Sequence, residues 1–187
     1  MRVRLARQGE GKDVARLAEM ALQGRGQGDD TGDLAEAIDA AGGKVKVPFG
    51  HAYAFVADED GAVCGLLYTT PPVRLAEDCE EFGAACQQRL AERVAEIELL
   101  AVEEEHRGRG MAKHLLDVGE ISLRQRGCGA LLVQVLADDE PVKAWYKRQG
   151  YRLLGPGEVV ALRVGGELIP IASTGTTYLT GVKHLAG

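Results

Sequence analysis

Two carboxylates and a run of glycines and arginines have the types and spacing that could carry out chemistry. Glu96 and Glu98 lie two positions apart in a mostly apolar stretch that predicts a strand over residues 96–102, so their side chains should share one face. A glycine- and arginine-rich turn follows over 106–112, and the apolar spacing after it predicts an amphipathic helix. Two arginines and two glycines are therefore expected at a helix N-terminus.

A helix N-terminus of this composition is suited to hold an anion. The first N–H groups of a helix have no partner inside it, and the helix dipole adds partial positive charge there. Gly108 and Gly110 would let a phosphate approach the main chain, and Arg107 and Arg109 add formal charge. Further charge could come from Lys113 and the flanking histidines. We expect a phosphate at this turn, with a diphosphate as the first choice.

Two other phosphate motifs do not fit this turn. No Gly-Lys-Ser/Thr follows, as a P-loop would require, and the third small residue of the dinucleotide-binding fingerprint is absent at Lys113. For the four residues 107–110 taken alone, an ordinary helix start remains the alternative.

The turn and a second stretch downstream together resemble a known enzyme family. Arg107-x-x-Gly110-x-Ala112, after a predicted strand, is similar to the acyl-CoA-binding pattern Arg/Gln-x-x-Gly-x-Gly/Ala of the GNAT superfamily of N-acetyltransferases. Residues 144–151, AWYKRQGY, resemble that family's second motif, an aromatic-Tyr-x-x-x-Gly-aromatic helix end. The order and spacing of the two motifs match over residues 94 to 155.

The resemblance implies a fold and a cosubstrate. The fold would be α/β (α+β), with a mixed, mostly antiparallel central sheet, a parallel splayed strand pair and flanking helices in a single domain over 1–187. Acetyl-CoA would be the cosubstrate, and no metal is expected. The residues expected to bind it are Leu100, Ala101, Val102, Arg107, Gly108, Arg109, Gly110, Met111 and Ala112.

The resemblance also implies acetyl transfer to a primary amine by direct attack in a ternary complex. An alkylamine with a pKa of about 10.4 arrives protonated at neutral pH, so a carboxylate base is needed. Glu96 is slightly preferred over Glu98 for this role. Tyr146 would donate a proton to the departing thiolate, and a main-chain N–H near Leu100 would stabilise the oxyanion.

A different class of function stays open beside the enzyme. A non-catalytic acyl-CoA-binding module would keep the glycine- and arginine-rich turn over 106–112, called the phosphate turn below, but not the acid, the base or the acceptor site. Binding of another nucleotide is a weaker third alternative. The acceptor of an enzyme would be a small-molecule amine or a protein amine. Both kinds suit an acidic protein.

Composition places limits on the partners. The net charge of -6 over 187 residues argues against general nucleic-acid binding, and no apolar run reaches membrane-spanning length. The four cysteines have no metal-ligand spacing, so we expect free thiols in a reducing compartment, the cytoplasm. No signal-peptide pattern is expected at the N-terminus.

The remaining elements are expected from periodicity and turn residues. Two of them depart from the family's usual pattern: an inserted helix over about 75–93 and an extra hairpin over about 159–171. Either could reshape the acceptor site or contribute to a homodimer. Residues 24–32 are expected as a loop, within a candidate lid over 24–50, and Asp139 as a helix cap. Further strands are expected at 3–6, 53–57, 63–69, 130–136 and 176–182, and further helices at 11–22 and 33–40.

Overall fold

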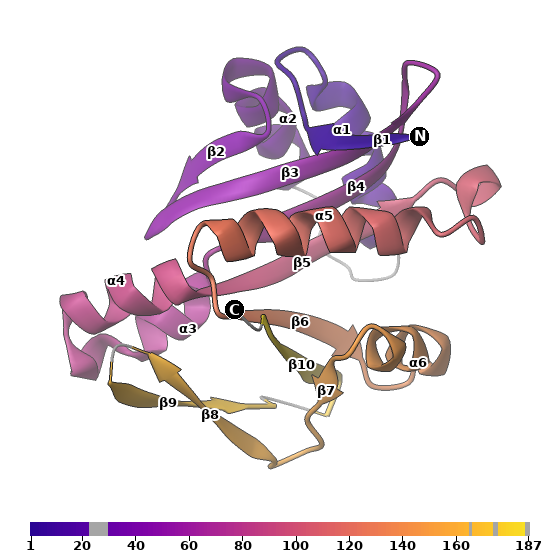
Figure 1. The fold of residues 1–187 in the computed structure, drawn as a ribbon. Helices are drawn as coiled ribbons and strands as arrows, with labels where there is room; N and C mark the ends of the chain where they lie inside the picture. Colours follow the sequence, from indigo (N-terminus) through magenta and orange to yellow (C-terminus); the bar gives the residue numbers. More distant parts are fainter. Residues whose placement is uncertain (23–29, 165, 174–175, 186–187) are drawn as a thin grey trace. The chain divides into compact units, whose positions relative to one another are not determined.

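The computed structural model describes residues 1–22, 30–164, 166–173 and 176–185. By their internal contacts these residues form two compact units, and each unit is considered by itself. Unit 1 comprises Met1–Thr70 and Glu98–Ser122, and unit 2 comprises Pro71–Ile97 and Leu123–Gly187. Figure 1 shows the helices and strands of both.

Unit 1 is an antiparallel sheet with helices on both faces. Its strands are β1 (Arg2–Leu5), β2 (Lys44–Val47), β3 (Gly50–Glu59), β4 (Ala62–Thr70) and the second half of β5 (Val94–Val102). Its helices are α1 (Gly11–Leu22), α2 (Asp30–Ala41), the short 3-10 helix η2 (Glu104–His106) and α5 (Met111–Gln125) as far as Ser122. The strand order is β1-β3-β4-β5, and β2 pairs with β3 beyond the end of β1.

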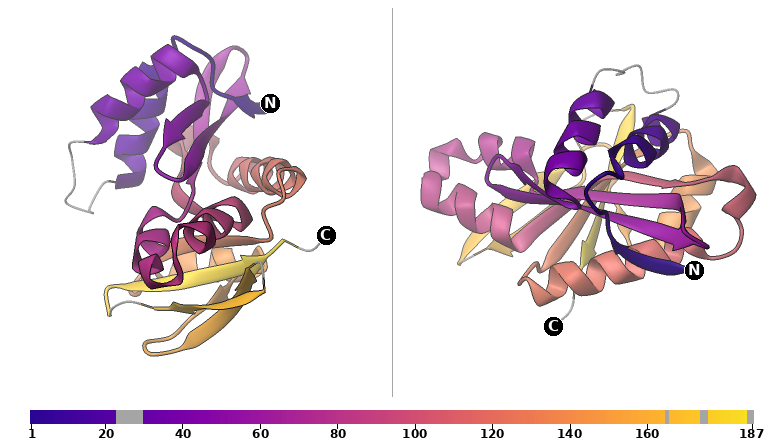
Figure 2. Two further views of the ribbon diagram at one scale, coloured as in Figure 1. Left: turned by 90° about the vertical axis from the view of Figure 1, so that its left-hand side faces the viewer. Right: turned by 90° about the horizontal axis from the view of Figure 1, so that it is seen from above.

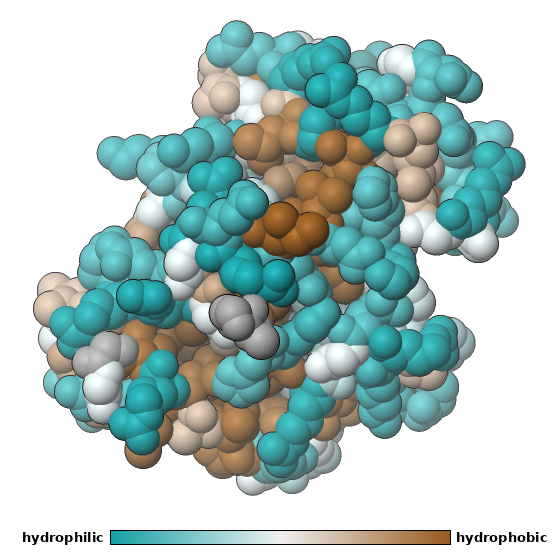
Figure 3. All heavy atoms as spheres, viewed as in Figure 1, coloured by the Kyte–Doolittle hydropathy of each residue, from teal (hydrophilic) through white to brown (hydrophobic). Residues whose placement is uncertain are grey.

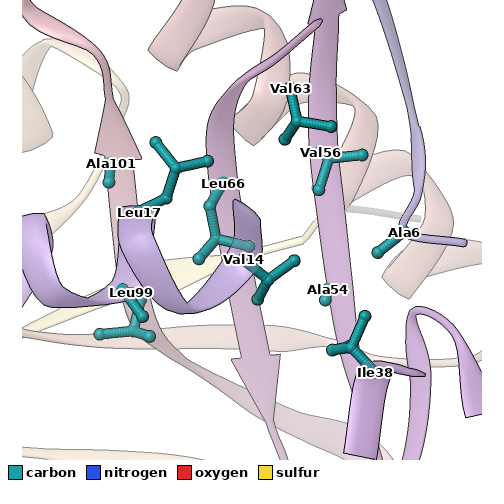
Figure 4. Packing of buried hydrophobic residues seen from close by; sticks show 11 residues of the cluster. Ala6, Val14, Leu17, Ile38, Ala54, Val56, Val63, Leu66, Leu99 and Ala101 are labelled. Carbon is teal, nitrogen blue, oxygen red and sulfur yellow. The ribbon is translucent and has the colours of Figure 1, made fainter. Parts of the chain in front are cut away.

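The core of unit 1 lies between the sheet and helices α1 and α2. Val14 and Leu17 are three residues apart on α1 and lie against Leu66 of β4, while Leu99 of β5 closes the same layer (Figure 4). These four side chains are almost completely buried. The amphipathic spacing of α1 therefore positions β5 through direct packing.

Helix α5 covers the opposite face of this sheet. A Cβ atom at Gly119 of α5 would lie 2.4 Å from Leu67 Cδ2, and one at Gly65 of β4 would lie 3.0 Å from Leu115 Cδ1. The two glycines thus let α5 approach the strands closely. Figure 1 shows α5 in front of these strands, with α1 and α2 behind them.

Unit 2 contains the parallel strand pair. The first half of β5 pairs in parallel with β6 (Ala130–Leu136), from Val94 opposite Ala130 to Ile97 opposite Val133. β6 then pairs antiparallel with β10 (Tyr178–His184), which also pairs with β7 (Arg152–Leu153). Helix α6 (Glu140–Arg148) contacts β6 and β7. The chain is thus of the α/β class, mostly antiparallel with one parallel pair and flanked by helices, as predicted.

The two segments predicted to be additions to the family pattern both lie in unit 2. The helix expected over 75–93 is divided into α3 (Val73–Asp78), the 3-10 helix η1 (Glu80–Phe82) and α4 (Ala84–Arg93). The division falls at Gly83, whose φ of 81° is left-handed. The expected hairpin is present as β8 (Val159–Val164) and β9 (Glu167–Ala172), a separate two-stranded sheet that Figure 2 shows from two sides.

Other expected elements are found with shifted ends. Strands β3 and β4 are longer than predicted, so the turn between them shrinks to Asp60 and Gly61. Of the loop expected over 24–32, residues 24–29 lie outside the described residues and residues 30–32 already belong to α2. Strand β2 was not predicted. No helix among the described residues combines the length and apolar character needed to cross a bilayer.

Candidate active site

The glycine- and arginine-rich turn leads directly into α5, as the sequence predicts. Gly108 and Gly110 have φ values of 75° and 82°, a backbone conformation that favours glycine. No atom lies within 4 Å of a Cβ built at either position, so the space beside the turn is open. The turn is also exposed over residues 107–110. A phosphate could therefore reach its main chain without displacing other groups.

The main-chain N–H groups at the start of α5 are available to an anion. The first hydrogen bond of the helix runs from His114 N to Gly110 O over 3.0 Å. Among the described residues, no group accepts a hydrogen bond from the N–H groups of residues 110–113. These are the donors that a helix leaves unpaired at its N-terminus, where the dipole favours negative charge.

Arg107 connects the turn to the end of the central strand. Its Nε donates a 2.9 Å hydrogen bond to the carbonyl oxygen of Val102, the last residue of β5. Two segments that the sequence predicts to bind one cosubstrate are thereby in direct contact. The end of β5 is thus joined by a hydrogen bond to the turn that leads into α5.

The other cations predicted at this turn have acidic neighbours. The side chain of Arg109 is 64% exposed and lies 3.8 Å from Glu59. Lys113 forms an ion pair with Asp117, one turn further along α5, over 2.6 Å. Both side chains are exposed enough to turn towards an anionic ligand. Local positive charge at the turn therefore comes first from the main chain and from Arg107.

His106 supports the turn rather than adding to its positive face. Its two ring nitrogens lie 3.4 Å from a carboxylate oxygen of Glu59 and 3.3 Å from one of Glu103. Glu103 also pairs with Arg16 of α1, and Arg16 Nη2 donates to Val63 O over 3.0 Å. This network links η2 to α1, β3 and β4. The segment that precedes the phosphate turn is therefore held in place by contacts with three other elements.

Glu98, in unit 1, is exposed and has two polar neighbours on β4. Thr70 Oγ1 donates to Glu98 Oε1 over 3.1 Å. Burial, and then the charge of Glu98, raises the pKa of Tyr68 to about 12, so this phenol stays protonated at neutral pH. Sequence reasoning missed both neighbours because they belong to another strand. Tyr68 lay within the strand predicted over 63–69 and Thr70 just beyond its end, and neither position identifies a partner.

Glu96, in unit 2, is partly buried and belongs to a row of polar side chains across three strands. Gln134 Nε2 of β6 lies 3.5 Å from Glu96 Oε1. Thr180 Oγ1 of β10 in turn donates to Gln134 Oε1 over 3.3 Å. Glu96 therefore has a hydrogen-bond donor beside it in a mostly apolar strand. Neither Gln134 nor Thr180 was predicted to belong to the surroundings of Glu96.

Tyr146 lies at the buried side of α6 and is 5% exposed. Its ring packs edge-on against Tyr151, with centroids 5.2 Å apart. Gly150, with a φ of 88°, reverses the chain so that Tyr151 can return to this ring. At the other end of α6, Asp139 Oδ1 accepts a 3.0 Å hydrogen bond from Val142 N, which confirms the predicted cap. The second sequence motif, residues 144–151, therefore forms the end of α6 and the turn that brings Tyr151 back to Tyr146.

The predicted site residues are therefore divided between the two units. Glu98 and residues 100–112 lie in unit 1, whereas Glu96 and Tyr146 lie in unit 2. Within unit 1 the structure brings Arg107 and Val102 into contact. Within unit 2 it sets Glu96 on the parallel strand pair.

A turn of this kind between a strand and a helix, with the second motif at the end of α6, matches a known family. The model of the acetyltransferase (GNAT) family covers residues 21–151. The chain belongs to the GNAT family. Among its relatives is the mycothiol acetyltransferase of Corynebacterium jeikeium (strain K411), which is 32% identical over 63 residues. That match spans 34% of this chain and only 18% of the mycothiol acetyltransferase.

Solved structures of acetyltransferases share the fold. The putative acetyltransferase yncA from Salmonella typhimurium, solved with its cofactor acetyl-CoA, gives a TM-score of 0.64 at 14% identity, covering 100% of this chain and 95% of that one. An aminoglycoside 6'-acetyltransferase type Ii gives a TM-score of 0.62 at 14% identity, covering 100% and 99%. At this identity the similarity establishes the GNAT fold.

Proposed function

We propose that this protein transfers an acetyl group from acetyl-CoA to a primary amine. The observation that carries the proposal is the start of α5, where the N–H groups of residues 110–113 have no acceptor among the described residues. They follow a turn with open space beside Gly108 and Gly110 and an arginine hydrogen-bonded to the end of β5. The diphosphate of acetyl-CoA would accept hydrogen bonds from the N–H groups of residues 110–113. Membership of the GNAT family supports acetyl-CoA over other nucleotides.

The rest of the cosubstrate would lie along the end of β5. The amides of the pantetheine arm would pair with the main chain of residues 100–102 as if they were a further strand. The thioester carbonyl would then lie near Leu100, whose main-chain N–H would stabilise the oxyanion. The Arg107–Val102 hydrogen bond supports this arrangement because it fixes residue 102 relative to the phosphate turn.

Transfer would proceed by direct attack in a ternary complex. The neutral amine nitrogen attacks the thioester carbonyl carbon, the new C–N bond forms, and the C–S bond breaks. The proton lost by the amine passes to Glu96 or Glu98, directly or through water. The CoA thiolate takes a proton from the Tyr146 hydroxyl. Solvent then returns a proton to Tyr146. Glu96 is the first candidate base because it is partly buried in an apolar strand.

The acceptor would be a cationic amine, of a small molecule or of a protein. An excess of acidic residues, 28 against 22 basic ones, favours the approach of a cation. Glu98 is exposed and could contact an ammonium group before it loses its proton. An acceptor screen that follows CoA release would identify the amine.

We also propose that the protein is located in the cytoplasm and forms a homodimer. The four cysteines are free thiols, which suits a reducing compartment. Val159 and Leu168 of the β8–β9 hairpin are each 55% exposed, and hydrophobic surface appears in the lower part of Figure 3 among mostly hydrophilic residues. Light scattering at micromolar concentration tests the dimer, and a monomer mass would contradict it.

Calorimetric titration with acetyl-CoA tests the binding site. Gly110→Glu should abolish saturable binding, because it places bulk and negative charge where the diphosphate would lie. Gly157→Glu is the matched control, since Gly157 also has a positive φ, 76°, and open space beside it, but lies in unit 2. Absence of binding to the wild-type protein, or equal loss in both variants, would overturn the proposal.

A second variant separates the enzyme from a non-catalytic acyl-CoA-binding module. Tyr146→Phe should lower kcat by about 10²- to 10⁴-fold, because it removes the proton donor for the thiolate. The Kd for acetyl-CoA should stay nearly unchanged. Trp145→Phe, on the same helix, is the control and should keep most of the activity. Tight acetyl-CoA binding without turnover on any amine would favour the module.

A further inference from the structure

Unit 2 contains a cavity that the acetyl-transfer proposal does not use. Its volume is about 450 Å³, within the range of about 300–1,000 Å³ that is usual for small-molecule sites. Its walls come from α4, the starts of β5 and β6, strand β8 and the end of β10. All of these lie in unit 2, whereas the phosphate turn lies in unit 1.

Two of the cavity walls belong to the segments predicted to be additions to the family pattern. Helix α4 lies in the inserted segment, and β8 is the first strand of the extra hairpin. The two elements pack against each other. The two predicted additions thus form two sides of one pocket.

The charge on the cavity wall is positive in an acidic protein. Arg89 and Arg93 of α4 and Arg163 of β8 line it, and Glu92 is the one carboxylate among the lining residues described. Glu92 is engaged with Gln88, whose Nε2 donates to it over 3.0 Å. His184 adds a further group that can carry positive charge. Three arginines against one acidic residue among the lining residues described favour an anionic ligand.

The guanidinium groups have hydrogen-bonding capacity left for a ligand. Arg89 Nε is buried, and within the described parts of the chain it has no hydrogen-bond partner. A buried donor without a partner is costly, so a ligand acceptor would stabilise it. Arg93 Nη1 donates to Gly127 O over 3.3 Å, which holds this side chain in place. Planar guanidinium groups bind carboxylate and phosphate groups through paired hydrogen bonds.

The framework of the cavity is held by main-chain hydrogen bonds. Gly129 N donates to Arg93 O over 2.7 Å, and Leu185 N donates to Gly129 O over 2.9 Å. These bonds join the end of α4, the start of β6 and the end of β10. Leu162 and Val164 of β8 supply buried apolar side chains to the same wall. The pocket is therefore fixed in shape and can contact an apolar body as well as a charged group.

We propose that this cavity binds a small organic anion, in which a carboxylate or phosphate group meets the arginines and an apolar body meets β8. The site is separate from acetyl-CoA binding and does not depend on it. Its function would be to let an anionic metabolite bind to this protein through residues that the minimal family pattern lacks.

Phenyl phosphate and phenylacetate are suitable probes, because they share an apolar ring and differ in the anionic group. Each would be titrated into ¹⁵N-labelled protein and followed by NMR. The proposal expects saturable shifts of the amides of Gly129 and Arg163 with at least one probe, and the stronger probe identifies the preferred anion. Shifts confined to residues 108–112, or no saturable shifts with either probe, would overturn it.

Variants of opposite charge sharpen the test. Arg163→Gln should weaken binding of the stronger probe about tenfold, the loss of one charge-assisted hydrogen bond. Glu92→Gln should tighten it, because it removes the carboxylate from the wall. Arg74→Gln, at an exposed position of α3, and Gly110→Glu should leave it unchanged. Arg93→Gln replaces Arg163→Gln if the latter fails to fold, and equal effects of the Arg and Glu variants would contradict the proposal.

Discussion

Glu96 and Glu98 differ in their surroundings although they stand two residues apart. Glu96 is partly buried beside Gln134, whereas Glu98 is exposed and accepts a hydrogen bond from Thr70. A base is needed only while the amine is protonated, so its loss should matter less as the pH rises. This gives each carboxylate a measurable signature.

Glu96→Gln should therefore lower kcat by about 10²- to 10⁴-fold at neutral pH. The deficit should shrink as the pH approaches the amine pKa of about 10.4, because the acceptor then arrives neutral. The pH profile of kcat with one saturating amine is the measurement, with Glu98→Gln measured in parallel. A larger, pH-dependent deficit in Glu98→Gln would transfer the role to that residue.

Residues of the motifs could be predicted from the sequence, but their partners could not. The glycines of the phosphate turn have positive φ, and Asp139 caps α6, because both features depend on neighbours a few positions away. Tyr68 and Gln134 were missed because they meet the glutamates across strands. Alternation in a strand fixes the face of a side chain but not the residue opposite to it.

At the scale of elements, an ion-pair network joins β1, the start of α1 and β3. Arg4 binds Glu10 through two hydrogen bonds of 2.8 and 2.7 Å, and it binds Asp58 over 2.8 Å. Hydrogen bonds from Arg4 lower the pKa of Glu10 and the pKa of Asp58 below their ordinary values of 4.5 and 3.8. A lowered folded-state pKa stabilises the fold above the ordinary value, and this stabilisation is lost as the pH falls through the folded value.

Arg4→Met should accordingly lower the Tm at pH 7, and its difference from the wild type should shrink between about pH 5 and pH 3. The other carboxylates titrate in both proteins and cancel in this difference. Thermal unfolding across that range is the measurement. Arg74→Met, on α3, should show a small difference that does not vary with pH. A constant deficit in Arg4→Met would mean that packing, rather than charge, links these elements.

The junction between α2 and β2 has no room for a side chain. A Cβ at Gly43 would lie 2.5 Å from Ala54 O and 2.6 Å from Ala6 N, both main-chain atoms. Gly43→Ala should lower the free energy of unfolding by about 1–3 kcal/mol. Gly32→Ala, in the first turn of α2 with open space, should leave it unchanged or raise it by about 0.4–1 kcal/mol. Urea denaturation compares the two, and equal values would contradict the argument.

Elements with long or strongly punctuated patterns were predicted well. β6 is a continuous apolar run and begins and ends where expected, and the β8–β9 hairpin follows its Gly-Gly signal. β2 was missed because it has four residues, two of them exposed lysines, as is common at sheet edges. The break between α3 and α4 was not predicted, because apolar residues keep helical spacing across it. Gly83 was the one residue in the sequence that could have indicated the break.

At the scale of the whole molecule, basic groups are clustered locally although the net charge of the protein is -6. One such place is the phosphate turn of unit 1, and another is the arginine-lined cavity of unit 2. The family and the fold class could be predicted because two motifs stand in the right order. The cavity could not, since its walls come from segments about 70 residues apart in the chain.

The four cysteines of the chain are free and buried: Cys64, Cys79, Cys86 and Cys128. Burial raises the pKa of Cys64, the pKa of Cys79 and the pKa of Cys128, and the thiolate is the form that attacks disulfide reagents. A chromogenic disulfide reagent should thus react with released CoA well before it reacts with the folded protein. If the same reagent is added without substrate, the rate of colour formation would measure the rate at which unfolding exposes the buried thiols.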